Sequence, residues 1–159
     1  MYKMSVLENA EIKRKIQELL DKGSIRRNTS PCGSPIVLVP NKDGAWCMCV
    51  DSQALNKIMV SNNYPLPHIY DMLDQLTDIV YFTKLGMRRN YHQIRIVDDG
   101  IWKTPFKTKQ GLFEWLVMSF GLCNAPATFM IAMNAVLRPI LDDIVIVYLD
   151  DILIFCKTC

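Results

Sequence analysis

Two adjacent carboxylates, Asp150 and Asp151, stand between two apolar segments near the C-terminal end of the sequence. Residues 144–149 before them and 152–155 after them predict a hairpin with both acids at its turn. An unpaired charge beside buried strands costs on the order of several kcal/mol, so a bound cation is one way to stabilise the pair. Paired acids are also typical of ordinary turns, and the dipeptide alone leaves both interpretations open.

Hard divalent cations such as Mg2+ take oxygen ligands, and two of them can stabilise the attacking and leaving oxygens of phosphoryl transfer. Two ions need more than one carboxylate at the same point. Neighbouring strand residues face opposite sides of a sheet, so Asp150 and Asp151 cannot both aim at that point from an ideal strand. We therefore expect a third acid from another strand.

The elements that must position these acids follow from hydrophobic periodicity and from turn residues. Ser5 and Glu8 predict a capping box at the start of a helix that Gly23 ends. Residues 35–50 predict a hairpin whose polar tip is 41–44. Further helices are predicted over 69–76 and 124–139, and further strands over 80–85, 91–96, 102–107 and 112–117. Helices with a mostly antiparallel sheet indicate a single α+β domain.

The composition is that of a folded domain. Of the 159 residues, 50% are apolar and 21% are charged, whereas a disordered chain has few apolar residues. The formal net charge of +2 does not by itself point to nucleic acid. No apolar run approaches the roughly 18 residues of a membrane span, and charges fill the first 20 residues where a signal peptide is apolar. We expect an intracellular protein, cytoplasmic or nuclear and not secreted or membrane-bound, with free thiols.

Short motifs follow one another across nearly the whole sequence. They are LLDKGSIR (19–26), SPCGSPIVLVPNKDG (30–44), ALNK (54–57), NYPLP (63–67), YFTKL (81–85), YHQIRI (91–96), WKTPFKT (102–108), GLFEWLVM (111–118), FGLCNAPATF (120–129) and YLDDILIF (148–155). With these motifs in this order, the chain resembles the reverse transcriptase domain of gypsy-type long-terminal-repeat retrotransposon Pol polyproteins. Each motif alone is weak, but the ordered set is highly specific.

The resemblance implies an α+β reverse transcriptase fold. Fingers would cover roughly residues 1–80, and a palm with an antiparallel sheet and packed helices would cover roughly 81–159. No thumb, protease, RNase H or integrase region is expected. The implied reaction is template-directed: a DNA primer on an RNA or DNA template attacks the α-phosphate of a deoxynucleoside triphosphate, assisted by two Mg2+ or Mn2+ ions. In the family, the remainder of a Pol polyprotein accompanies this domain.

Roles for single residues are implied by the same resemblance. Asp150 matches the main metal ligand of the palm turn, and Asp151 matches its supporting neighbour. Tyr91 matches the aromatic gate beneath the sugar, where a ring excludes a 2′-hydroxyl. Nucleotide contacts are implied for Lys42 at the tip of the hairpin, Phe120, Gly121 and Leu149. A lysine in a turn is also often only solvated, which leaves the role of Lys42 open.

The chain departs from the family pattern at the third metal ligand. Gly86 stands where the family has an aspartate at the end of the strand over 80–85. Glycine has no side-chain oxygen, so the resemblance implies a polymerase that is inactive or severely impaired, with weak ion binding. Cys47 stands where the family has an arginine that contacts nucleotide phosphates. Further departures lie at Ser52, Gln53, Arg89, Asn90 and Ser119.

Two alternatives follow from these departures. The chain could be a nucleic-acid-binding remnant that keeps the fingers cleft without turnover. It could also hold zinc on Cys156 and Cys159, or on Cys47 and Cys49 together with His68 or His92. Structural zinc usually takes four ligands in paired knuckles, which disfavours the zinc interpretation.

Overall fold

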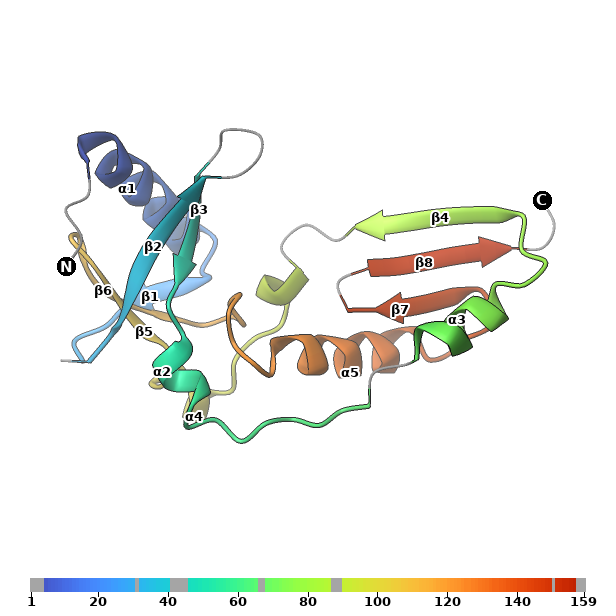
Figure 1. The fold of residues 1–159 in the computed structure, drawn as a ribbon. Coiled ribbons are helices and arrows are strands. Elements are labelled where there is room, and N and C mark those ends of the chain that lie inside the picture. The colour runs from blue at the N-terminus through green and yellow to red at the C-terminus, as the bar shows by residue number, and fades with distance from the viewer. Residues whose placement is uncertain are drawn as a thin grey trace. The chain divides into compact units, whose positions relative to one another are not determined.

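The computed structural model describes residues 5–30, 32–40, 46–65, 68–86, 90–149 and 151–156. The chain divides into two compact units, each built from two separate stretches of sequence. Unit 1 comprises Met1–Met59 and Tyr91–Leu122, and unit 2 comprises Val60–Asn90 and Cys123–Cys159. Each contains helices and a β-sheet, which confirms the α+β class (Figure 1). The assignment of fingers to residues 1–80 and of palm to 81–159 stays a prediction.

Unit 1 is a five-stranded sheet in the order β1-β6-β5-β2-β3. Its neighbours are antiparallel except for β2 and β5, which run parallel where Ser34 pairs with Phe106. Its elements are α1 (Val6–Asp21), β1 (Ile25–Arg27), β2 (Ser34–Pro40), β3 (Trp46–Val50), α2 (Gln53–Asn56), the 3-10 helix η1 (Asn90–Gln93) at the boundary of the unit, α4 (Asp98–Ile101), β5 (Pro105–Thr108) and β6 (Gly111–Trp115). The predicted hairpin is confirmed as β2 and β3, and its predicted tip over 41–44 lies outside the described residues.

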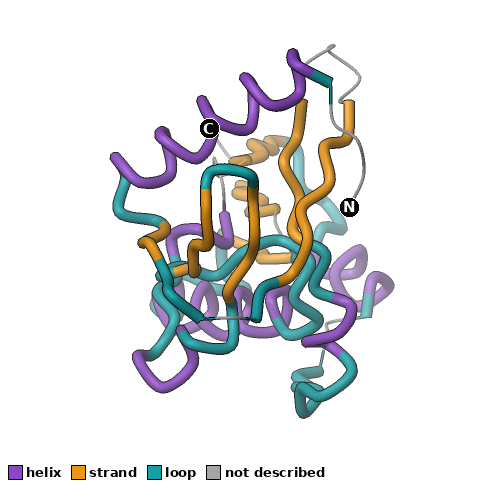
Figure 2. The backbone as a smooth tube through the Cα atoms, turned by 90° about the vertical axis from the view of Figure 1, so that its left-hand side faces the viewer, coloured by secondary structure: helices purple, strands orange, loops and turns teal. Residues whose placement is uncertain are grey.

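Helix α1 begins and ends at the residues that the sequence predicts. The Ser5 hydroxyl accepts from the Glu8 backbone N–H at 3.2 Å, and the Glu8 carboxylate accepts from the Ser5 N–H at 2.6 Å. Gly23 follows the helix with φ +62°, the left-handed conformation that ends many helices. Figure 2 shows α1 as one continuous helix beside the strands of unit 1.

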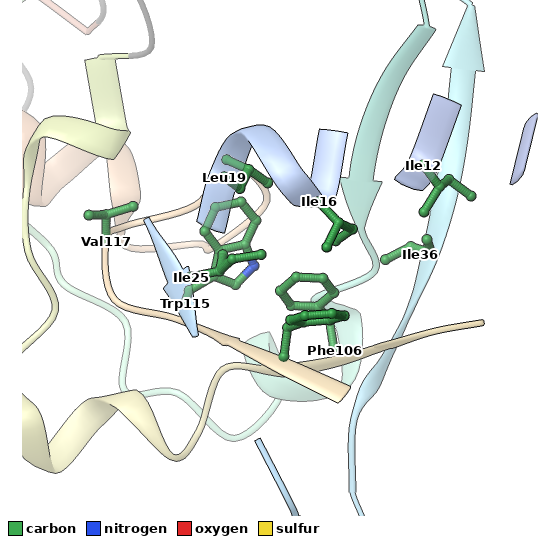
Figure 3. Close-up of a cluster of buried hydrophobic side chains, with 9 residues drawn as sticks. Ile12, Ile16, Leu19, Ile25, Ile36, Phe106, Trp115 and Val117 are labelled. Carbon is green, nitrogen blue, oxygen red and sulfur yellow. The ribbon is translucent and has the colours of Figure 1, made fainter. Parts of the chain in front are cut away.

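The core of unit 1 lies between α1 and the sheet. Phe106 and Phe113 pair directly across β5 and β6, and their exposed fractions are 0% and 1%. The rest of the cluster comes from the apolar stripe of α1 and from neighbouring strands: Ile12, Ile16, Leu19, Ile25, Ile36, Trp115 and Val117 (Figure 3). Burying this stripe is what holds the helix against the sheet.

Unit 2 is a three-stranded antiparallel sheet, β4-β8-β7, with α5 alongside (Figure 1). Its elements are α3 (Ile69–Gln75), β4 (Tyr81–Gly86), α5 (Ala125–Leu137), β7 (Val145–Tyr148) and β8 (Asp151–Cys156). Met130 of α5 packs against Val145, Val147 and Ile152 in a buried cluster. Within the described ranges, no helix is long and apolar enough to cross a bilayer.

One predicted strand is wrong, and another begins later than predicted. Residues 91–96 form η1 and one isolated bridge between Arg95 and Val117, because the rings of Tyr91 and His92 pack on other aromatic rings rather than alternating across a sheet. The segment 102–107 becomes a strand only at Pro105, because α4 precedes it and opens with two acids that favour a helix N-terminus. The predicted helices over 69–76 and 124–139 are confirmed as α3 and α5.

Candidate active site

The predicted acidic turn joins β7 to β8. Tyr148 pairs with Asp151, so the connection consists of Leu149 and residue 150. Asp150 itself lies outside the described residues. Leu149 has φ +52°, which is uncommon for a leucine, and its backbone N–H donates to the Met130 sulfur at 3.1 Å. Leu149 is therefore tied to helix α5.

Gly86 lies directly opposite Asp151 in the pairing of β4 with β8. Side chains at directly opposed positions have Cβ atoms about 4.5–5.5 Å apart, so a side chain at position 86 would lie beside the Asp151 carboxylate. A Cβ placed on Gly86 would meet no described atom within 4 Å. The structure thus brings together the two positions that the sequence singles out, and no described atom fills the space beside Gly86.

A lysine is paired with Asp151. The Lys84 Nζ lies 2.8 Å from the Asp151 Oδ2, and Lys84 precedes Gly86 by two residues, on the same face of β4. The two side chains are 64% and 52% exposed, and ion pairs at such exposure contribute only about 0–1 kcal/mol. Sequence reasoning missed Lys84, although the two-residue period of a strand was the signal that places it beside position 86.

The side chains near Asp151 show whether the described residues could hold two divalent ions. Among the described residues, no three His, Cys, Asp or Glu side chains lie close enough to hold a metal ion. Beside Asp151, the opposing strand offers Gly86 without an oxygen and Lys84 with a positive charge. Mg2+ needs several oxygen ligands, so the described residues do not fit a pair of ions.

The aromatic candidates lie in unit 1. The rings of Tyr91 and Phe120 meet edge to face with centroids 4.8 Å apart and an interplanar angle of 66°. Tyr91 is 7% exposed, whereas Phe120 is 50% exposed. The centroid of the His92 ring lies 5.9 Å from that of Phe120 and 5.1 Å from that of Trp115. The cluster therefore fixes Tyr91 and leaves Phe120 with accessible surface, the kind on which a base can stack.

Gly121 follows this cluster with φ +93°, a backbone conformation that favours glycine. A Cβ there would lie 3.5 Å from the Val50 carbonyl oxygen and 3.6 Å from the Ser52 hydroxyl. The Gly121 carbonyl accepts from the Asn56 side-chain amide at 2.7 Å. The segment after Phe120 is thus held against α2 at a position where a larger residue would be strained.

The remaining candidates divide between described and undescribed positions. Lys42 and Cys159 lie outside the described residues. The sulfurs of Cys47 and Cys49 lie 3.9 Å apart, but in the described part of the chain no third His, Cys, Asp or Glu joins them. The four-ligand zinc alternative therefore finds no support among these residues.

Similar proteins were found by sequence. A family model described as reverse transcriptase (RNA-dependent DNA polymerase) matches residues 39–159. The retrovirus-related Pol polyprotein from transposon 297 of Drosophila melanogaster is 40% identical over 159 residues, which cover 97% of this chain and 15% of that protein. An RNA-directed DNA polymerase homolog of Oenothera berteroana is 46% identical over 108 residues, 68% of this chain and 76% of that protein. The chain spans a small part of the fly polyprotein.

Solved structures with the same fold include two of foamy viral protease-reverse transcriptase. The complex with an RNA/DNA hybrid has a TM-score of 0.82 and 28% sequence identity, and the match covers 99% of this chain and 21% of that chain. The complex with double-stranded DNA has the same TM-score and identity, and the match covers 99% and 33%.

Proposed function

The chain belongs to the reverse transcriptase family of retrotransposon and retroviral Pol polyproteins, and we propose that its polymerase centre is inactive or severely impaired. The observation that carries this proposal is the open position at Gly86, directly opposite Asp151. The ordered motifs support a gypsy-type origin and a degenerate domain. An intracellular site of action, cytoplasmic or nuclear, is part of the same proposal.

Reverse transcriptases in general use divalent metal ions. In the reaction that we propose for an intact centre, the primer 3′-oxygen bonds to the α-phosphorus of a deoxynucleoside triphosphate and pyrophosphate leaves. Two ions would stabilise the charge on both oxygens. Loss of one carboxylate from such a site costs several kcal/mol of transition-state stabilisation, which lowers the rate by about a hundredfold or more. This chain would therefore turn over slowly even with all substrates bound.

The other candidate residues receive roles in binding. Tyr91 is proposed as the gate under the sugar, because the edge-to-face contact with Phe120 keeps its ring from swinging aside. Phe120 and Gly121 are proposed to line the nucleotide, and Leu149 to lie beside the acids. Lys42 is proposed to contact the triphosphate.

The proposal is tested by restoring the carboxylate. Gly86→Asp is compared with Gly86→Asn, which has nearly the same shape without the charge, and no described atom obstructs either side chain. We expect Gly86→Asp to raise Mn2+ affinity by at least about tenfold and Gly86→Asn to change it little. Lys84→Met should change the affinity by less than about fivefold, because the Lys84–Asp151 pair is exposed. Electron paramagnetic resonance of free Mn2+ measures all three.

Primer extension with and without Mg2+ measures activity. The wild-type chain is expected to incorporate no measurable deoxynucleotide. For this assay, the chain is fused to the part of the transposon 297 polyprotein that follows the region matched here. In the fused chain, Gly86→Asp should restore incorporation and Gly86→Asn should not. Robust incorporation by the wild type would refute the inactive centre.

A non-catalytic nucleic-acid binder is the second candidate. It is favoured by the intact packing around Tyr91, Phe120 and Gly121, in contrast to the open position at Gly86. The foamy viral relatives were solved with an RNA/DNA hybrid and with double-stranded DNA. Salt-sensitive binding of a primer–template duplex without incorporation would favour this candidate, since phosphate contacts release counterions.

A further inference from the structure

The β2–β3 hairpin has two faces of different chemistry. On one face, Ile36, Leu38, Met48 and Val50 pack on the core of unit 1. The other face carries Cys47 and Cys49 on β3, directly across from Val39 and Val37 on β2. The two valines are 47% and 48% exposed, and β3 is the last strand of its sheet. The two thiols therefore lie on a face that solvent and ions reach.

The two sulfurs are already spaced as metal ligands. The Cys49 thiol donates to the Cys47 sulfur with the two Sγ atoms 3.9 Å apart. A tetrahedral ion with metal–sulfur bonds of about 2.3 Å holds two sulfurs about 3.8 Å apart. A disulfide has a sulfur–sulfur bond of about 2.05 Å, so the two sulfurs would have to move much closer together to form one. The observed spacing suits a shared ion better than a direct sulfur–sulfur bond.

We propose that Cys47 and Cys49 form a two-thiolate chelate site for a thiophilic divalent cation of the Zn2+ or Cd2+ class. Soft thiolate ligands select such ions over Mg2+. Binding forms two metal–sulfur bonds and breaks two S–H bonds, so each ion releases two protons to solvent. The other two coordination positions are filled by water or by a small ligand, because the described residues offer no third protein ligand there.

The ion would compensate a charge repulsion between the two ligands. Two thiolates at this distance repel one another, and a shared cation removes that repulsion. The pair uses neither of the acids proposed to hold the polymerase ions, although Cys47 stands at the position of the family's phosphate-contacting arginine.

The test uses Cd2+ as the probe on the full reduced chain. Serine replaces the other four cysteines, Cys32, Cys123, Cys156 and Cys159, so that only Cys47 and Cys49 remain. We expect one Cd2+ per chain, a cadmium–thiolate charge-transfer band in the ultraviolet, and release of two protons per ion. Adding Cys47→Ser or Cys49→Ser should weaken binding by at least about a hundredfold, because the second ligand no longer binds within the same molecule.

A matched control variant tests whether Cd2+ binding depends on the placement of the two thiols or only on their number. Met48→Cys with Cys49→Ser keeps two thiols in β3 but puts them on opposite faces, and it should weaken Cd2+ binding as much as the single serine variants. Circular dichroism checks that this variant is folded, since Met48 packs on the core. Equal Cd2+ affinity in this variant, or no charge-transfer band with Cys47 and Cys49 intact, would overturn the proposal.

Discussion

Unit 1 closes a core around large aromatic side chains, whereas two elements of unit 2, α3 and β4, have no buried side chain. The central strands of unit 1 bring Phe106 and Phe113 to almost complete burial. In unit 2, all six residues of β4 are exposed, and α3 has no buried residue. Phe82 on β4 is 51% exposed, and Leu73 on α3 is 56% exposed. A contiguous patch of such side chains would mark an interaction site or an aggregation risk.

The two units also differ in how much the backbone conformation depends on a glycine at a candidate site position. Gly86 contributes to the sheet of unit 2 through its backbone, which every residue except proline can supply, so the strand pairing does not depend on a carboxylate at position 86. Gly121 in unit 1 has φ +93°, a conformation that L side chains rarely adopt, so most substitutions there would strain the backbone. Under the proposed function, loss of the carboxylate at position 86 would therefore leave the fold intact.

Replacing one phenylalanine in each unit by alanine gives the strongest test of the difference in burial between the two units. Phe106→Ala should lower the free energy of unfolding by about 3–5 kcal/mol, because it leaves a cavity in a closed core. Phe82→Ala should cost less than about 1 kcal/mol, because half of that side chain is already in water. Urea unfolding followed by circular dichroism measures both. A loss at Phe82 equal to that at Phe106 would mean that β4 is covered in solution.

One ion pair in each unit gives a second comparison, with smaller expected changes in the free energy of unfolding. Arg26 and Lys84 are similarly exposed at 59% and 64%, but their partners Glu114 and Asp151 are 8% and 52% exposed. Glu114 accepts from Arg26 Nε at 2.5 Å and from the Asn28 amide at 2.7 Å. Arg26→Ala should cost about 1–3 kcal/mol because a buried carboxylate loses a partner, whereas Lys84→Ala should cost at most about 1 kcal/mol.

The same unfolding assay, with double-mutant cycles to Glu114 and Asp151, measures these couplings. Equal costs for Arg26→Ala and Lys84→Ala would show that the burial of the carboxylate does not set the energy of the pair. A coupling between Lys84 and Asp151 above that of the Arg26 pair would contradict the open character of unit 2.

Local signals predicted much of this fold. The capping box at Ser5 and the glycine at position 23 predicted the ends of α1 correctly. Apolar runs beside turn residues predicted the β2–β3 and β7–β8 hairpins. The strand predicted over 91–96 failed because Tyr91 and His92 pack on rings that are distant in the sequence, which no local pattern reveals. The parallel pairing of β2 with β5 is equally non-local.

The candidate site was predicted in part. The family resemblance identified Gly86 and Asp151 as partner positions, and the register places them opposite one another. Periodicity alone could not have paired them, because it does not say which strands are neighbours. The ion pair of Lys84 was missed, and the roles of Asp150 and Lys42 stay predictions because both lie outside the described residues.

The smallest effect is expected on the solvent side of α1. Glu11 accepts from Arg14 Nε at 3.0 Å and from Nη2 at 2.6 Å, and these hydrogen bonds lower the pKa of the Glu11 carboxyl below its ordinary 4.5. A carboxyl whose pKa is lowered by folding adds stability above its unfolded pKa, and loses it as the pH falls through the folded pKa. Glu11→Gln should therefore lower the melting temperature slightly at pH 7, and this difference should vanish well below pH 4.5. Added salt should shrink it as well, because exposed charges are screened. A difference that persists in acid would mean that Glu11 acts through packing of its side chain, and that the polar side of α1 contributes to the closed character of unit 1.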